Sequence, residues 1–170
     1  MARLGLHPGV PVALAVSGGG DSVALMRLAA EWAGRSGNVT VLTVDHGLRS
    51  GSRKEAALVR EWAKAAGLPA QVLRWSGKKP KANLEEKARA ARYRLLGDWC
   101  RAHGVAALLV AHTREDQAET FLLRLGRGSG VDGLSAMPAQ AQFPVVGFEE
   151  IALYRPLLDF GRAELRADLA

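Results

Sequence analysis

The stretch that decides the fold is ALAVSGGGDSVALMRLAA, residues 13–30. An apolar run is followed by three glycines and an acid, and then by apolar residues at helical spacing. The run Val12–Val16 predicts a buried strand and the segment after Asp21 predicts a helix, so the small residues between them form a strand-to-helix turn. This arrangement is typical of α/β proteins, in which ligands bind where parallel strands end.

The rest of the chain repeats this alternation of short apolar runs and helical segments. Three more buried strands are expected, at residues 39–44, 72–75 and 107–110. Ser52 and Asn83 stand where a polar side chain can cap a helix. Thr113 and Asp116 open a further helix, whose apolar side chains are expected to point inward: Phe121, Leu122 and Leu125. The alternation predicts an α/β fold, a doubly wound, mainly parallel sheet with helices on both faces.

Length and composition predict one domain over residues 1–170. The single cysteine, Cys100, excludes an internal disulfide and a zinc site made of cysteines, and it favours a reducing compartment. The first apolar run, Val10–Val16, is too short to span a bilayer and does not resemble a secretory signal. We therefore expect a cytoplasmic protein with no membrane segment. The four tryptophans are expected in the core: Trp32, Trp62, Trp75 and Trp99.

The net charge of +6 lies in one segment, Arg74–Arg101, which holds nine basic and three acidic residues. The remainder of the chain is electrically balanced. A concentrated positive patch is typical of proteins that bind a polyanion. A solvated helix face beside a lysine-rich loop explains the same pattern, so charge alone leaves both interpretations open.

Polar residues follow each expected strand. They are Ser17–Ser22 after the first, Asp45–Gly47 after the second, Lys78–Lys81 after the third and His112–Glu119 after the fourth. Because the carboxyl ends of parallel strands meet at one edge of a sheet, these segments are expected to converge there.

The first of these segments has the chemistry of a phosphate site. Consecutive glycines let the main chain approach a ligand, and the N–H groups at a helix N-terminus attract an anion. Neither a Gly-Lys-Ser/Thr loop nor a G-x-G-x-x-G motif is present. A flexible turn would explain one or two glycines, but not the whole segment. The expected phosphate contacts are Ser17, Gly18, Gly19, Gly20, Asp21 and Ser22.

Ser17–Ser22 also resembles the S-G-G-x-D-S loop of the N-type ATP pyrophosphatases, the PP-loop superfamily, which split ATP between its α and β phosphates. Further stretches are similar to the tRNA(Ile)-lysidine synthetases of that superfamily: VDHGLRSGS at 44–52, NLEEKARAARYRLL at 83–96, AHTREDQAETFLLRLGRGSGVDGLSAMP at 111–138 and YRPLL at 154–158. The resemblance runs from about Pro11 to the C-terminus.

The resemblance implies an adenine nucleotide alpha hydrolase-like fold that uses ATP and Mg²⁺. ATP would adenylate the C2 oxygen of the wobble cytidine of tRNA(Ile) with a CAU anticodon. The ε-amine of free L-lysine would then displace AMP and give lysidine. Members of the family carry further tRNA-clamping domains after the catalytic one, which are absent from this chain. ATP binding with weak tRNA affinity and slow turnover is therefore expected.

Within this resemblance, Asp21 is expected to hold Mg²⁺ and Arg92 to contact phosphate. Asp116 and Glu119 are spaced i, i+3 and so share one helix face. Either carboxylate could bind lysine or magnesium, and one could accept a proton from the attacking amine. The sequence does not distinguish these roles.

Asp45, His46 and His112 are further candidates for the nucleotide site, because each follows a strand. A capping or packing role is the alternative for both histidines. The glycine-rich segment Gly126–Gly133, with Arg127 and Ser129, is expected to lie over the site and touch ATP or tRNA. A simple connector is the alternative for that segment.

Other activities of the superfamily fit the sequence less well. Thiolation commonly uses site cysteines, often in a C-x-x-C motif, whereas Cys100 is alone and late in a helix. Synthesis of GMP or NAD needs ammonia delivery or a tightly dimeric bundle, for which no signal is found. An ATP-binding module without catalysis is the main alternative, and it predicts that Asp116 and Glu119 are dispensable.

Overall fold

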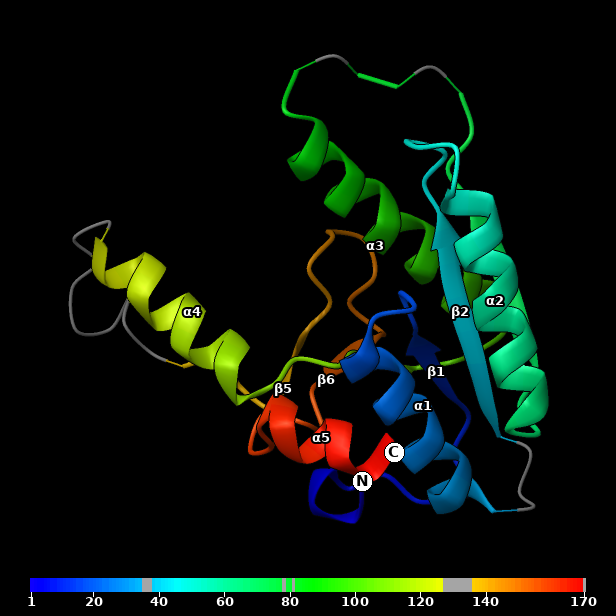
Figure 1. The fold of residues 1–170 in the computed structure, drawn as a ribbon, viewed down its shortest axis with the longest axis vertical. Coiled ribbons are helices and arrows are strands. Elements are labelled where there is room, and N and C mark those ends of the chain that lie inside the picture. The colour runs from blue at the N-terminus through cyan, green and yellow to red at the C-terminus, as the bar shows by residue number, and fades with distance from the viewer. Residues whose placement is uncertain (35–37, 78, 81, 127–135, 170) are drawn as a thin grey trace.

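The computed structural model describes residues 1–34, 38–77, 79–80, 82–126 and 136–169. Its helices and strands alternate over most of the chain (Figure 1). In chain order the elements are η1 (Ala2–Leu4), β1 (Val12–Ala15), α1 (Gly20–Ala33), β2 (Val39–Asp45), α2 (Ser52–Ala65), β3 (Ala70–Arg74), α3 (Leu84–Ala102), β4 (Ala107–Leu109), α4 (Arg114–Gly126), β5 (Gln140–Gln142), β6 (Ala152–Tyr154) and α5 (Arg162–Leu169).

The strands form one six-stranded sheet in the order β3-β2-β1-β4-β6-β5. All neighbours are parallel except the pair β5 and β6. The chain builds outward from β1 through β2 to β3 and then returns to place β4 on the other side of β1. This reversal leaves a crevice at the carboxyl ends of β1 and β4, which is where open α/β sheets bind ligands.

Helices cover both faces of the sheet, which confirms the predicted architecture. Val12 and Leu14 of β1 face a core that includes side chains of α1, α2 and α5. Ala13 faces a second core, to which α3 and the segment before β6 contribute. Because β1 is buried on both sides, its sequence is continuously apolar. In α3, Gly97 admits the ring of Phe148, since a Cβ at this glycine would lie 2.8 Å from the ring.

The strands β5 and β6 were not predicted. Each has only three residues, and β5 is a polar edge strand with the sequence Gln-Ala-Gln. Such short segments carry no periodic signal of their own. They become strands through tertiary pairing, because β6 pairs with the free edge of β4 and β5 then pairs with β6.

Two predicted helix caps are wrong in detail. Helix α2 begins at Ser52 itself, with Gly51 before it, and the Ser52 hydroxyl donates to Asp45 Oδ1 at 2.7 Å. Asn83 does occupy the N-cap position of α3, but at φ 52°, and its side chain makes no capping hydrogen bond. The Ser52 hydroxyl therefore bonds to the carboxylate of Asp45 at the end of β2 and not to the backbone of the helix.

The inward orientation predicted for the apolar side chains of α4 is also wrong. Phe121, Leu122 and Leu125 are 45%, 63% and 52% exposed, and no described residue of α4 is buried. Helix α4 leads away from the body of the molecule (Figure 1). Helical spacing identifies an apolar face, but it does not say whether the described chain supplies a surface to cover that face.

The tryptophans were predicted to lie in the core, but none of the four is fully buried. Trp32 and Trp99 are half-buried at the edges of the two cores, whereas Trp62 is 40% exposed. The indole ring is large, so a helix position that only borders the sheet leaves part of it in solvent. Within the described residues, no helix has the length and apolar character needed to cross a membrane.

Candidate functional site

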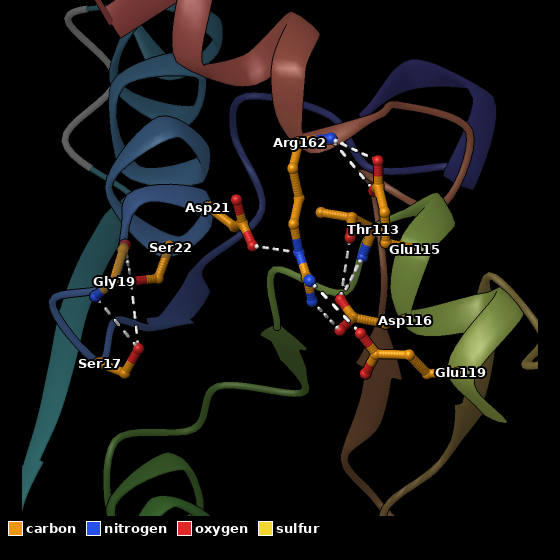
Figure 2. A network of polar contacts seen from close by, with 9 residues as sticks. All are labelled: Ser17, Gly19, Asp21, Ser22, Thr113, Glu115, Asp116, Glu119 and Arg162. Carbon is orange, nitrogen blue, oxygen red and sulfur yellow. Dashed lines mark hydrogen bonds and ion pairs between the residues drawn. The ribbon is translucent and has the colours of Figure 1, made fainter. Parts of the chain in front are cut away.

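The phosphate loop, Ser17–Ser22, connects β1 to α1 at the carboxyl edge of the sheet. Gly19 is the N-cap of α1, so the helix starts at Gly20. The Ser22 hydroxyl donates to the Gly19 carbonyl at 2.8 Å, and the hydroxyls of Ser17 and Ser22 lie 3.3 Å apart (Figure 2). These contacts hold the loop around the first turn of α1, where backbone N–H groups lack helical acceptors. The arrangement is suited to an anion.

Only one of the three glycines needs a backbone conformation that favours glycine. Gly18 has φ +91°, and a Cβ there would also approach Val59 Cγ2 to 3.3 Å. Gly19 has φ −71°, and a Cβ on Gly20 would meet nothing within 4 Å. The backbone of the fold therefore favours glycine at position 18. Gly19 is the N-cap of α1, a position where glycine is common, whereas the backbone of Gly20 and the space around it would accept a side chain.

Three carboxylates predicted from distant parts of the sequence converge on one guanidinium (Figure 2). Arg162 Nη2 lies 2.7 Å from Asp116 Oδ1, Nε lies 3.3 Å from Asp21 Oδ2, and Nη1 lies 3.4 Å from Glu119 Oε1. The negative charge of Asp116, followed by that of Glu119 and Asp21, raises the pKa of Arg162. The acidic cluster is therefore partly neutralised from within the chain.

Arg162 was missed by the sequence analysis, although a signal was present. It is the first residue of α5, where the helix dipole disfavours a cation. The helix end is satisfied instead by Glu115, whose two carboxylate oxygens each accept from the Arg162 backbone N–H at 3.0 Å. A basic residue at such a position indicates that its side chain has a partner elsewhere.

The carboxylates of Asp116 and Glu119 have different surroundings. Asp116 Oδ2 accepts from the backbone N–H of Thr113 at 2.7 Å and from its hydroxyl at 3.1 Å, while Oδ1 accepts from Arg162. Both oxygens of Asp116 are thus engaged at the start of α4. Glu119 has an exposed side chain, and its one contact among the described residues is the long one with Arg162. It is the carboxylate of this pair with most capacity for an external cation.

Three cavities of the described chain adjoin the phosphate loop, and two of them share Ser17 and Arg92. The smaller, of 210 Å³, is lined by seven of the predicted residues: Ser17, Gly19, Asp21, Ser22, Arg92, His112 and Asp116. The larger, of 460 Å³, has an apolar wall from β1, β2 and α3 and includes Ser17, His46, Arg49 and Arg92. Ser17 and Arg92 line both, so the cavities meet beside the loop. A volume of several hundred cubic ångströms is typical of small-molecule sites.

Asp45 lines neither cavity. It is buried at the end of β2, where it accepts from Ser52 Oγ at 2.7 Å and from the Gly47 N–H at 3.0 Å. The hydrogen bond from Ser52 is the main cause of its lowered pKa and outweighs the opposing effect of burial. The contacts of Asp45 in the described chain therefore organise the turn between β2 and α2.

The two histidines have lowered pKa values. His46 lines the larger cavity and packs edge-on against Trp75, and its buried Nδ1 has no hydrogen-bond partner in the part of the chain that the structure describes. Burial, with Arg92 and Lys79 nearby, lowers its pKa. Burial, followed by the charge of Arg155, lowers the pKa of His112 to about 4. Both rings are therefore neutral near pH 7.

The basic segment lies partly at this edge. Arg92 is half-buried with its guanidinium 5.0 Å from the Tyr93 ring centroid, whereas Arg89 and Arg94 on α3 are exposed. Lys79 donates to the Trp75 carbonyl and lies over its ring. The predicted contacts of Lys78 and Lys81, and those of the segment 127–133 with Arg127 and Ser129, lie outside the described residues.

Among the described residues, no three His, Cys, Asp or Glu side chains form a group able to hold a metal ion. Asp21 offers one carboxylate, which faces the smaller cavity from the first turn of α1. Mg²⁺ in nucleotide sites is commonly held by one or two carboxylates together with phosphate oxygens. Asp21 fits that requirement when phosphate supplies the other ligands.

This combination of sheet order, glycine loop and acidic cluster defines a nucleotide-type site. The sequence model of the PP-loop domain matches residues 7–170, and the chain belongs to this family. The chain is 52% identical over 159 residues to the tRNA(Ile)-lysidine synthase of Bradyrhizobium diazoefficiens. This match covers 92% of the chain and 43% of the relative. The chain is 48% identical over 157 residues to the enzyme of that name from Wolbachia pipientis, covering 91% of this chain and 35% of the other.

The chain thus spans less than half the length of these curated relatives. Among solved structures, the U34-tRNA thiolase NcsA of Methanococcus maripaludis superposes with a TM-score of 0.74 at 17% identity. That match covers 94% of this chain and 56% of the thiolase. The NH3-dependent NAD synthetase of Campylobacter jejuni superposes with a TM-score of 0.55 at 17% identity, over 92% of this chain and 61% of the synthetase. At this identity the likeness establishes the fold.

Proposed function

We propose that this chain carries the catalytic site of a tRNA(Ile)-lysidine synthase and acts in the cytoplasm. The observation that supports this most directly is the convergence of the phosphate loop, Asp21, Arg92 and Asp116 on one cavity. Relatives about half identical to this chain carry that name. The reaction consumes ATP, free L-lysine and tRNA(Ile) with a CAU anticodon, and yields lysidine, AMP and pyrophosphate.

In this proposal, ATP lies across the two adjoining cavities. The apolar 460 Å³ cavity receives the adenosine, and the phosphates lie over the N-terminus of α1. Arg92 lines both cavities, so its charge is suited to the phosphate between them. Asp21 would hold Mg²⁺ with the phosphate oxygens, and the ion supplies charge neutralisation for the departing pyrophosphate.

In the first step, the C2 oxygen of the wobble cytidine forms a bond to the α-phosphorus of ATP. The bond between the α-phosphorus and the pyrophosphate oxygen breaks, and pyrophosphate leaves. The N–H groups of the phosphate loop and the guanidinium of Arg92 stabilise the negative charge that develops on the leaving group. In the second step, the ε-amine of lysine attacks C2, AMP leaves with the oxygen, and the amine loses a proton.

The lysine side chain approaches from the acidic cluster. Glu119 is exposed and weakly paired, so its carboxylate is the group we assign to the incoming ammonium. Asp116 contributes negative charge while its oxygens hold Thr113 and Arg162. This division of roles rests on the hydrogen bonds that the two carboxylates make in the described chain. It predicts that Glu119→Gln raises the KM for lysine more than it changes the affinity for ATP.

The basic residues of α3 are proposed to contact tRNA. Lys87, Arg89 and Arg94 are exposed on the helix that also carries Arg92 into the site. Phosphate contacts by such residues make binding fall steeply with salt. Replacing Arg89 and Arg94 by glutamate should therefore weaken tRNA binding and flatten its salt dependence.

The deciding experiment incubates the protein with ATP, Mg²⁺, labelled lysine and unmodified tRNA(Ile) bearing CAU. Lysine-dependent pyrophosphate release, with label entering the tRNA, supports the proposal. Glu119→Gln is compared with Glu61→Gln, which changes an exposed carboxylate on α2 outside both cavities. Binding of ATP without pyrophosphate release under any of these conditions would instead favour a non-catalytic module.

Thiolation remains a weaker alternative. The single cysteine, Cys100, lies on α3 with its side chain buried in the core, and burial raises the pKa of its thiol to about 12. It cannot serve as a thiolate nucleophile in that environment.

A further inference from the structure

The ring of His112 contacts Arg155, a half-buried arginine that follows the neighbouring strand. β4 and β6 pair in parallel, so His112 and Arg155 emerge side by side from their carboxyl ends. Arg155 Nε lies 3.2 Å from His112 Nδ1, and Nη1 donates to the Pro138 carbonyl at 2.8 Å. The backbone N–H of Arg155 also donates to the Ala139 carbonyl at 2.8 Å. The guanidinium is thus fixed at both ends.

The chemistry of the guanidinium decides the direction of its bond to the ring. Arginine carries five N–H donors and no acceptor, and it stays charged in proteins. His112 Nδ1 must therefore accept, so the proton of the neutral imidazole resides on Nε2. Protonation at Nδ1 would place an N–H against the guanidinium N–H and break the hydrogen bond.

We propose that Arg155 is a positioning residue that holds His112 as the neutral Nε2–H tautomer, so that His112 is a hydrogen-bond donor to a phosphate oxygen in the site. His112 lines the 210 Å³ cavity together with Ser17, Gly19 and Ser22 of the phosphate loop. An imidazole whose only lone pair faces Arg155 has none to offer the cavity, so His112 is not the general base of the reaction. The tautomer follows from the hydrogen bond between Arg155 and His112, whereas the phosphate contact rests on the proposed function.

The charges around the ring support a neutral donor. Arg155 faces it from the end of β6, Arg89 and Arg92 from α3, and Asp116 from α4. The three cations disfavour a charged imidazole and the carboxylate favours it, but burial is the largest effect and lowers the pKa of His112 to about 4. The His112 ring therefore stays neutral, and remains a hydrogen-bond donor, across the pH range in which an ordinary histidine titrates.

The first test is ¹⁵N NMR of the unliganded protein with labelled histidine between pH 5 and 8. His112→Gln identifies the His112 resonances among those of the four histidines. The expected result is an Nε2–H tautomer whose shifts stay constant over this range. A His112 that carries its proton on Nδ1, or that titrates near pH 6.5, would overturn the inference. This test needs no substituted Arg155 and no ligand.

The second test replaces the arginine. In Arg155→Met, both tautomers should appear and the pKa of His112 should rise toward its usual range. Arg155→Lys should restore the Nε2–H form wherever its ammonium reaches Nδ1. Arg166→Met, an exposed arginine on α5, is the matched control and should leave His112 unchanged. An unchanged tautomer and titration in folded Arg155→Met would also overturn the inference.

The third test measures ATP affinity by calorimetry at several pH values, with wild type and variant compared at each so that the titration of ATP itself cancels. At pH 8, Arg155→Met should bind ATP about tenfold more weakly, the cost of one poorly directed hydrogen bond to a charged group. The difference should shrink toward pH 6 as the freed ring gains a proton. Equal affinities at pH 8 refute the phosphate contact. Failure of wild type to bind ATP would refute the proposed function and leave the NMR result standing.

Discussion

Substitution of single glycines in the phosphate loop separates what the fold requires from what a ligand requires. Gly18 has φ +91°, whereas Gly20 begins α1 and has open space where a Cβ would stand. A left-handed conformation costs an L-residue about 1–2 kcal/mol. For a chain of this length each kcal/mol lowers Tm by about 2–4 °C, so Gly18→Ala should melt about 2–8 °C below wild type.

Gly20→Ala is the matched control, because it adds the same methyl group two residues away. Alanine is favoured over glycine within a helix, so the Tm of this variant should equal or exceed that of wild type. The assay is thermal unfolding without ligand, followed by calorimetric titration with ATP. If backbone approach is the reason for glycine at position 20, Gly20→Ala weakens ATP binding although the fold is intact. Equal Tm losses in both variants, or none in Gly18→Ala, would refute this reasoning.

Three further predictions follow from contacts of the site and the core. Arg162→Met should reduce lysine transfer roughly tenfold, because Asp116 loses its guanidinium partner. The Tm of this variant should fall by only about 2–4 °C, since the pair is partly exposed. Arg162→Lys should recover part of the activity, and unchanged turnover in Arg162→Met would contradict this role. Ser52→Ala should destabilise the protein at pH 7 because its hydroxyl lowers the pKa of Asp45. The hydrogen bond stabilises the folded protein fully above pH 3.8, the ordinary pKa of aspartate, and this stabilisation is lost as the pH falls through the lower pKa that Asp45 has in the folded state. The difference in unfolding free energy between wild type and Ser52→Ala, measured in urea, should therefore be smaller at pH 3 than at pH 7. Cys100 should resist a thiol reagent at pH 8 until urea is added, because burial raises its pKa to about 12, and rapid labelling of the native protein would contradict its buried position.

The exposed face of α4 shows why local pattern does not determine burial. The spacing of Phe121 and Leu125 predicted a helix correctly, and the helix is present. Whether a helix face is buried depends on which surface lies opposite, and for α4 the described chain supplies none. The same reason explains Trp62, which has helical spacing but stands at the margin of the sheet.

The sequence by itself determined the parallel core, the phosphate loop and the set of polar residues at the strand ends. These follow from local rules, since apolar runs make buried strands and polar residues accumulate where strands stop at a ligand edge. These rules place Asp21, His112 and Asp116 at one edge of the sheet, and the resemblance to the PP-loop family adds Arg92. The 210 Å³ cavity brings the four residues together.

Only the tertiary structure decided how these residues are paired. Arg162 and Arg155 come from segments late in the chain, and each reaches the site because α5 packs against α1 or because β6 pairs with β4. Their contacts distinguish Asp116 from Glu119 and determine which nitrogen of His112 carries a proton. Such pairings depend on distances of about 3 Å between elements far apart in sequence, and no periodicity along the chain encodes them.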